Sequence, residues 1–304
     1  KLAPNLENFV TYLEMLTECK QFNTVLSELE ESKFNYGERK NEKLLLLEGY
    51  ARLKTNQIFR AISVFQEIIK LYPQNTDAKF YLGVIYYQKH QDSDAEKLFN
   101  SILEEIQCDR TYNYLGLLKL DQNKIADAIN YFQFAIKIEP NNAFYHYNLG
   151  TAYSLNGWLI EAEDSFKKAV SIEPNNIVYN YSLAYLYYEK KDFQRSQETI
   201  DHILLIDPNY VDAIILKSLI NAQKGNIIDA KNTLQNLSEK ISNNDFLYYA
   251  MAKIYKEFPM YKEAVECLQK ALFIKPESLE YLSELADCYC ELGQYQTAKD
   301  IATK

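Results

Sequence analysis

The sequence predicts an all-α protein in which one helical hairpin is repeated along the chain. Three observations support this fold class. Prolines recur at a fixed interval, since Pro140, Pro174 and Pro208 are 34 residues apart. Apolar residues between them keep helical spacing, and two positions of the period hold only small side chains. A period of this length is typical of repeat architectures, in which each repeat packs only on its neighbours.

The segment 143–176 shows the elements of one repeat most clearly. Its first half has apolar residues at helical spacing, and Gly157 follows where a helix C-terminal cap is expected. A second helix is expected from about Leu159 to Ile172, and Pro174 ends it. Each repeat is therefore predicted to contain a helix, a tight turn, a second helix and a short linker.

Three positions of the repeat hold side chains of restricted size. The eighth residue is Gly, Ala or Ser in every repeat, and the twentieth is Ala or Ser. We expect these small residues to let the two helices of a hairpin approach closely. The twenty-fourth residue is bulky, and we expect it to fill the space between adjacent hairpins. It is Phe65, Phe99, Phe132, Phe166, Ile200, Leu234 and Leu268 in successive repeats.

This pattern resembles the tetratricopeptide repeat. The family signature is matched in full by Leu149, Gly150, Tyr153, Ala162, Phe166, Ala169 and Pro174. The resemblance implies a right-handed superhelical α-solenoid of tandem helix-turn-helix hairpins. Repeats are placed at 42–75, 76–108, 109–142, 143–176, 177–210, 211–244, 245–278 and, in part, 279–304. Residues 1–41 fit the period poorly and are expected to form a degenerate helical hairpin that caps the array, because terminal repeats are usually atypical.

Composition and charge argue against several classes of function. The net charge of −9 opposes non-specific binding to nucleic acid or to anionic lipid. No run of 18 or more apolar residues is present, so no membrane span is expected. The five cysteines are odd in number and scattered, which predicts free thiols in a reducing compartment. The chain also starts without a basic and then apolar leader, and we therefore expect a cytoplasmic location.

The sequence carries no recognisable catalytic or metal-binding motif. His90, His146 and His202 occupy three different positions of the repeat, so they cannot line up on one face. Nucleophile-elbow, zinc-protease, phosphate-loop and paired-cysteine motifs are missing. We therefore expect these residues to form no active site and to bind no metal or cofactor.

The resemblance also indicates where a partner would bind. In the family, positions 2, 5, 9, 12 and 13 of each first helix face the concave surface. Aromatic side chains, which are frequent hot spots of interfaces, dominate these positions in the middle of the chain. The expected partner-binding residues are Tyr50, Phe80, Tyr87, Asn113, Phe144, Tyr147, Thr151, Tyr181, Tyr185, Tyr188, Phe246 and Tyr249. The predicted function is a non-catalytic scaffold that binds a peptide or helix of another protein in an aromatic-lined groove.

Two other functions are compatible with the same sequence. The repeats could be the regulatory or targeting region of a larger enzyme, for example a glycosyltransferase, with a catalytic domain beyond Lys304. They could also self-assemble through the C-terminal end, because Lys304 falls inside the second helix of its repeat. A carboxylate clamp like that of chaperone-binding tetratricopeptide domains is not expected, because the required basic residues are missing around Asn148.

Overall fold

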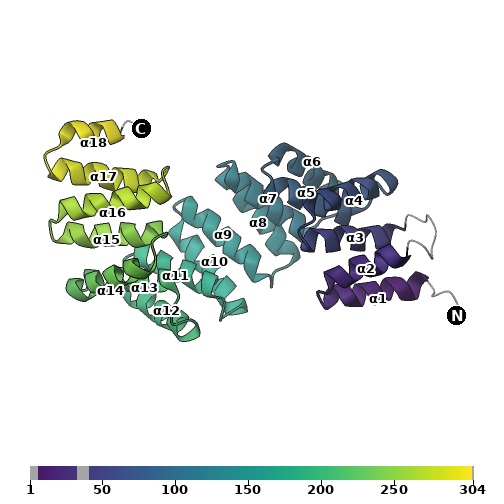
Figure 1. Ribbon diagram of the computed structural model, residues 1–304, viewed down its shortest axis with the longest axis horizontal. Helices are drawn as coiled ribbons and strands as arrows, with labels where there is room; N and C mark the ends of the chain where they lie inside the picture. Colours follow the sequence, from purple (N-terminus) through teal and green to yellow (C-terminus); the bar gives the residue numbers. More distant parts are fainter. Residues whose placement is uncertain (1–5, 33–40, 303–304) are drawn as a thin grey trace. The chain divides into compact units, whose positions relative to one another are not determined.

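The chain folds into consecutive α-helices, and between residues 41 and 302 short turns join them (Figure 1). The computed structural model describes residues 6–32 and 41–302. The helices are α1 (Leu6–Glu18), α2 (Phe22–Ser32), α3 (Glu42–Lys54), α4 (Ile58–Leu71), α5 (Thr76–Gln88), α6 (Asp92–Leu103), α7 (Asp109–Asp121), α8 (Ile125–Ile138), α9 (Ala143–Leu155), α10 (Leu159–Ile172), α11 (Ile177–Glu189), α12 (Phe193–Ile206), α13 (Val211–Gln223), α14 (Ile227–Lys240), α15 (Asp245–Glu257), α16 (Tyr261–Ile274), α17 (Leu279–Glu291) and α18 (Tyr295–Ala302). The predicted all-α class is confirmed.

Contacts divide the chain into two compact units, Lys1–Gly157 and Trp158–Lys304. We call them the N-terminal half and the C-terminal half and describe each by itself. In the N-terminal half, α1 to α8 form hairpins, with α2 packed on α3 and α8 packed on α9. In the C-terminal half, α10 packs on α11, and α11 to α18 form hairpins. Each helix thus buries its apolar side against its neighbours in the sequence, as expected of a repeat array.

The turn inside each hairpin depends on one residue in the left-handed backbone region. Gly157 has a φ of 75°, which confirms the predicted end of α9, and Gly225 has a φ of 92°. Asparagine, histidine or lysine adopts the same conformation at the corresponding turns of other hairpins, with Lys191 at a φ of 59°. Side chains other than glycine are strained in this region. The turn geometry is therefore kept even where the residue does not favour it.

Asparagine starts most of the first helices. Asn75 accepts a hydrogen bond from the Ala78 N–H at 2.7 Å, and Asn244 accepts one from the Leu247 N–H at 2.8 Å. Such an N-cap satisfies a backbone donor that the helix leaves without a partner. The prolines and asparagines of the linkers therefore end one hairpin and begin the next.

Inside the hairpins of the N-terminal half, a glycine of the first helix packs closely against a phenylalanine of the second helix. A Cβ atom built on Gly83 would lie 2.7 Å from Cε1 of Phe99, and one on Gly116 would lie 2.5 Å from Cε1 of Phe132. Both phenylalanines are fully buried. Ordinary carbon contacts are about 3.5–4.0 Å, so the ring occupies the space that a side chain at the glycine would need.

The corresponding positions of the C-terminal half divide this volume differently. In three of its hairpins, the first helix has alanine or serine instead of glycine and the second helix has isoleucine or leucine instead of phenylalanine. The pairs are Gly49 and Phe65, Gly83 and Phe99, Gly116 and Phe132, against Ala184 and Ile200, Ser218 and Leu234, and Ala252 and Leu268. A larger residue on one helix is thus matched by a smaller residue on the other.

The bulky residue also contacts the next hairpin. The ring of Phe65 stacks on Tyr81 of the following first helix, with ring centroids 5.6 Å apart, and Phe99 stacks on Tyr114 at 5.7 Å. The expectation that this residue lies between hairpins was therefore incomplete. It fills the space inside its own hairpin and forms part of the contact to the next one.

Candidate partner-binding surfaces

Four successive first helices of the N-terminal half surround one hollow of ≈ 650 Å³. Tyr50 of α3, Phe80 of α5, Asn113 of α7 and Phe144 of α9 line it, and all four belong to the twelve residues that the sequence predicted. The other lining residues are Leu53, Lys54, Asn56, Ile58, Tyr81, Val84, Gln88, Arg110, Tyr114, Asn142 and Tyr145. We refer to this feature as the N-terminal hollow.

Aromatic rings that contact one another form much of its wall. The Tyr50 and Tyr81 ring centroids are 5.2 Å apart, and those of Phe80 and Tyr114 are 5.4 Å apart in an edge-to-face arrangement. Such pairs fix each other's orientation. Burial raises the pKa of Tyr81 and of Tyr114, so both phenols stay neutral in neutral solution. The hollow therefore presents a mainly apolar wall with a few hydroxyl groups.

The exposure of the four predicted residues differs. Phe144 is 43% exposed and Tyr50 is half-buried, whereas Phe80 and Asn113 are buried. The Asn113 side chain accepts a hydrogen bond from Nδ2 of Asn148 at 2.7 Å, which links α7 to α9. Phe80 and Asn113 thus form the buried part of the wall, and Phe144 and Tyr50 form the part that a ligand can reach.

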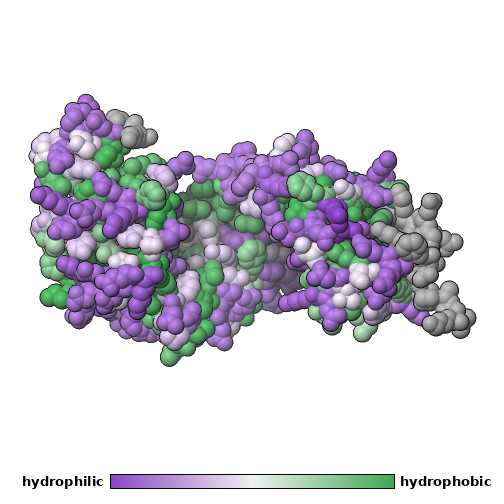
Figure 2. Space-filling view, viewed as in Figure 1, coloured by the Kyte–Doolittle hydropathy of each residue, from purple (hydrophilic) through white to green (hydrophobic). Residues whose placement is uncertain are grey.

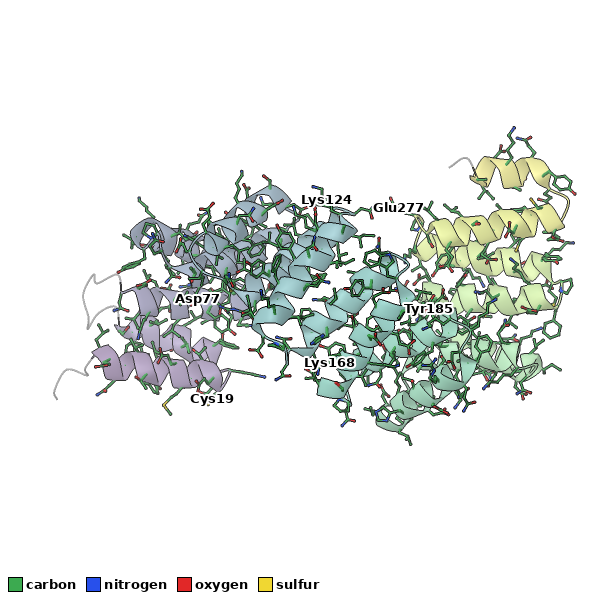
Figure 3. All side chains as sticks on the ribbon, turned by 180° about the vertical axis from the view of Figure 1, so that it is seen from behind. Cys19, Asp77, Lys124, Lys168, Tyr185 and Glu277 are labelled. Carbon is green, nitrogen blue, oxygen red and sulfur yellow. The ribbon has the colours of Figure 1, made fainter. Side chains whose placement is uncertain are left out.

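Among residues 6–32 and 41–302, two cations and no carboxylates line the N-terminal hollow. The Arg110 guanidinium lies 4.6 Å from the Phe80 ring centroid and donates to Asp77, labelled in Figure 3, at 3.0 Å. The Lys54 ammonium lies 5.2 Å from the Tyr50 ring centroid. In the described part of the chain, no carboxylate lies within ion-pair distance of Lys54.

Three further predicted residues of the N-terminal half do not line the hollow. Burial and a hydrogen bond with Asp121 raise the pKa of Tyr87, which is half-buried on α5. Tyr147 lies beside Phe144, with ring centroids 6.4 Å apart, and Thr151 donates a hydrogen bond to the Tyr147 carbonyl at 3.0 Å. These side chains lie on first helices as expected, and Tyr87 contacts Tyr114 of α7 with ring centroids 5.9 Å apart.

The predicted tyrosines of the C-terminal half form a cluster with one another. On α11, the Tyr185 ring lies between two others: its centroid is 6.3 Å from that of Tyr181 and 6.3 Å from that of Tyr188. Tyr185, labelled in Figure 3, also contacts Phe246 of α15 at 6.2 Å. Phe246 in turn lies 6.4 Å from Tyr249. All five predicted residues of this half thus belong to one aromatic cluster that spans two first helices.

The residues of this cluster are buried to different extents, and Tyr181, Tyr185 and Tyr188 are half-buried. Tyr249 is buried, and its hydroxyl donates to Glu280 at 2.6 Å. Burial and this hydrogen bond raise the pKa of Tyr249, and burial with Glu189 raises the pKa of Tyr188 to about 12. A recess beside Tyr188 has a volume of only ≈ 160 Å³. Ligand pockets are usually about 300–1,000 Å³, so the N-terminal hollow is the larger candidate site.

Sequence reasoning missed several residues of both surfaces. Tyr81 and Tyr114 line the N-terminal hollow from the sixth position of their repeats, which lies outside the inward set. Tyr281 stacks on Tyr249 with centroids 4.8 Å apart, from the third position of its repeat. Tyrosine occurs at the sixth position of two adjacent repeats, and this recurrence is a sequence signal that could have indicated Tyr81 and Tyr114.

The structure offers little for other kinds of site. Within residues 6–32 and 41–302, no three His, Cys, Asp or Glu side chains are grouped so that they could hold a metal ion. None of the described helices combines the length and the apolar character that a membrane crossing requires. The five cysteines are not joined to one another in the described part of the chain. In Figure 2, apolar residues appear among polar ones on the surface of both halves.

Comparison with known families accounts for most of the chain. Family models of the tetratricopeptide repeat match residues 52–115, 116–157 and 143–176. A model of the N-terminal TPR repeats region of Psidin matches residues 182–304. The chain is a tetratricopeptide repeat protein. The resemblance that the sequence pattern indicated is thereby confirmed.

Two curated relatives share short segments with this tetratricopeptide repeat protein. A TPR repeat-containing protein of Bacillus subtilis is 36% identical over 61 residues, which are 20% of this chain and 12% of the relative. An N-terminal acetyltransferase A complex subunit-like protein of Schizosaccharomyces pombe is 28% identical over 116 residues, which are 37% of this chain and 16% of the relative. The chain thus matches less than a fifth of the length of either relative.

Solved structures show the same fold at low sequence identity. A tetratricopeptide repeat protein of Parabacteroides merdae has a TM-score of 0.66 at 14% identity, covering 81% of this chain and 98% of its own. The APC/C hetero-tetramer Cut9–Hcn1 contains a chain with a TM-score of 0.61 at 15% identity. The match covers 94% of this chain and 49% of that one. YrrB, described as a TPR protein with an unusual peptide-binding site, has a TM-score of 0.50 at 18% identity. The match covers 62% of this chain and 97% of YrrB.

Proposed function

We propose that this tetratricopeptide repeat protein is a non-catalytic scaffold that binds a peptide or helical segment of another protein on the inward side of its first helices. One observation carries the proposal: residues from four successive repeats line a single hollow of ≈ 650 Å³. This volume lies within the usual range of ligand sites, about 300–1,000 Å³. YrrB, which has a similar fold, is described as having a peptide-binding site.

The wall of the N-terminal hollow is suited to binding because it is already ordered. Tyr50, Tyr81, Phe80 and Tyr114 hold one another through ring contacts of 5.2–5.8 Å. A partner that enters does not have to immobilise these side chains, so less conformational entropy is lost on association. Aromatic residues in such packed surroundings are frequent hot spots. In the C-terminal half, the half-buried Tyr185 and Tyr188 would add a smaller contact surface.

Site-specific photocrosslinking in the native cell tests this function. Benzoylphenylalanine replaces Phe144 at the hollow or, as a matched control, Phe59 of α4, which is 80% exposed and does not line the hollow. We expect a protein to be crosslinked from position 144 and not from position 59. Crosslinks from position 59 alone would place the binding surface on the second helices and contradict the proposal. Because one relative is named as subunit-like for an acetyltransferase complex, a catalytic subunit is one class of protein to look for.

Self-association is a second candidate function, and a surface at α17 and α18 favours it. A hollow of ≈ 540 Å³ lies between these helices, and two apolar side chains that line it, Leu279 and Tyr295, are 79% and 71% exposed. Exposed apolar patches often mark interaction sites. Sedimentation equilibrium over a range of protein concentrations measures the molecular mass in solution, which rises with concentration if the chain self-associates. A mass of 35.6 kDa at every concentration would exclude self-association of this chain.

A further inference from the structure

We infer that the N-terminal hollow binds a short acidic segment of the partner, with one apolar side chain seated between the aromatic rings and side-chain carboxylates facing Lys54 and Arg110. The inference rests on the proposed function and adds to it the chemistry of the bound segment. Its basis is the distribution of charge around the hollow, together with the volume and exposure of its wall.

The charged side chains in the described part of the wall are both cationic, and the nearby carboxylates of Asp77 and Asp109 are held by Arg110 and by the Tyr145 hydroxyl. The whole protein has a net charge of −9, yet Lys54 and Arg110 are the only charged side chains among the described residues of the wall. Arg110 already forms an ion pair with Asp77, with 3.0 Å between Nη2 of Arg110 and Oδ1 of Asp77. Lys54 has no such partner among the residues that the structure describes, and its described contact is with the face of the Tyr50 ring. A ligand with carboxylates would give Lys54 an ion pair, whereas a basic ligand would be repelled.

The wall around these cations favours an apolar anchor. Val84 and Phe80 are buried at its base, and Leu53, Ile58 and the 43% exposed Phe144 complete an apolar surface. Water above such a surface is released when an apolar side chain covers it. The nearby cations can then pair with acidic residues on either side of the anchor. The combination selects an acidic segment with one apolar residue over a uniformly charged segment.

The volume limits the length of the segment. One turn of an α-helix has a pitch of 5.4 Å and a diameter of about 10–12 Å with its side chains, and thus occupies roughly 500 Å³. A hollow of ≈ 650 Å³ therefore accommodates about one helical turn or an extended stretch of similar size. A long helix would have to lie mostly outside it. Recognition is consequently concentrated in a few residues.

Selection from a random-peptide display library on the whole chain tests the inference. Peptides with the enriched sequences are synthesised with a C-terminal amide, so that their only carboxylates are those of side chains. The affinity of each peptide is determined by fluorescence anisotropy. The variants are Lys54→Glu at the hollow and, as a matched control, Lys70→Glu, an exposed lysine of α4 that does not line it. Phe144→Ala tests the apolar anchor. Circular dichroism melting checks that each variant keeps its fold.

We expect enrichment of Asp and Glu around one apolar residue. For such a peptide, Lys54→Glu and Phe144→Ala should each weaken binding about tenfold or more, whereas Lys70→Glu should change it less than about twofold. Enriched peptides without acidic residues that still depend on Phe144 would overturn the inferred chemistry and leave the proposed function intact. Peptides whose affinity survives both Lys54→Glu and Phe144→Ala would overturn the hollow as their site. A failure to enrich any sequence would also overturn the inference, while crosslinking from position 144 would still test the proposed function separately.

Discussion

Replacing Gly116 by alanine should destabilise the α7–α8 hairpin, although alanine is normally the better helix residue. The added Cβ would lie 2.5 Å from Cε1 of Phe132, a ring with no exposed surface. To restore an ordinary contact of about 3.5 Å, the ring or the helix must move by about 1 Å. Such overpacking costs about 1–3 kcal/mol, and the gain in helix propensity returns about 0.5–1 kcal/mol. The net loss then lies between about 0 and 2.5 kcal/mol, and we expect about 1 kcal/mol, near the middle of that range.

The C-terminal half suggests the compensating change. Ala184 and Ile200 occupy the same two positions of their repeat without glycine or phenylalanine. In a Phe132→Ile background, the alanine at position 116 has room, and Gly116→Ala should become stabilising by about 0.5–1 kcal/mol. The substitution thus changes sign, which corresponds to a coupling energy within the range of about 0.5–3 kcal/mol found for residues in contact.

Hydrogen exchange measured by mass spectrometry is the suitable assay. It reports local opening free energies, whereas a repeat array need not unfold in one step. Exchange is followed in peptides from α7 and α8 for the wild type, both single variants and the double variant. Peptides from α15 and α16 of the other half serve as an internal control. If Gly116→Ala stabilises α7 and α8 equally in both backgrounds, volume matching between these positions is refuted.

Three further predictions concern the turns, the charges and the thiols. Lys191→Gly should stabilise the protein by about 0.5–1 kcal/mol, because the φ of 59° at this turn strains a residue with a side chain; a lower midpoint in urea would contradict this. Burial would raise the pKa of Glu163, but hydrogen bonds from Lys167 and Lys190 outweigh it and lower the pKa to about 2. Its carboxylate should therefore contribute about 2–3 kcal/mol above pH 5, and this contribution should be lost as the pH falls from about 4.5 to 2. The difference in urea stability between wild type and Glu163→Gln should shrink over that interval, and a constant difference would refute the assignment. In the native protein, Cys267 and Cys288 should react last with a thiol reagent, because both are buried and burial raises the pKa of each; all five thiols should react after denaturation.

The sequence period was sufficient to predict the helices, because each hairpin repeats the same local signals. Gly157 has the left-handed backbone that its place in the repeat predicted. What the period could not give is the rotation between successive repeats. That rotation brings Tyr185 next to Phe246, two repeats further along, and leaves Tyr249 buried. Inward positions of one repeat are therefore not equally accessible in another.

The lining of the hollow was predicted in part for the same reason. Tyr50 and Phe144 are accessible there, whereas Phe80 is covered by its neighbours. Tyr114 reaches the hollow from a position that the family pattern does not assign to the inward face. Which side chains share a wall depends on the contacts between repeats, and these follow from packing rather than from the spacing of residues in one repeat.

The affinity for the segment crosslinked from position 144 tests the central claim most directly. A labelled peptide of that segment is titrated with the wild type, with Phe144→Ala and with Phe59→Ala, two exposed phenylalanines of the same half. We predict that Phe144→Ala weakens binding about tenfold or more, equivalent to about 1.4 kcal/mol, and that Phe59→Ala leaves it unchanged. Unchanged binding by Phe144→Ala together with weaker binding by Phe59→Ala would contradict the account.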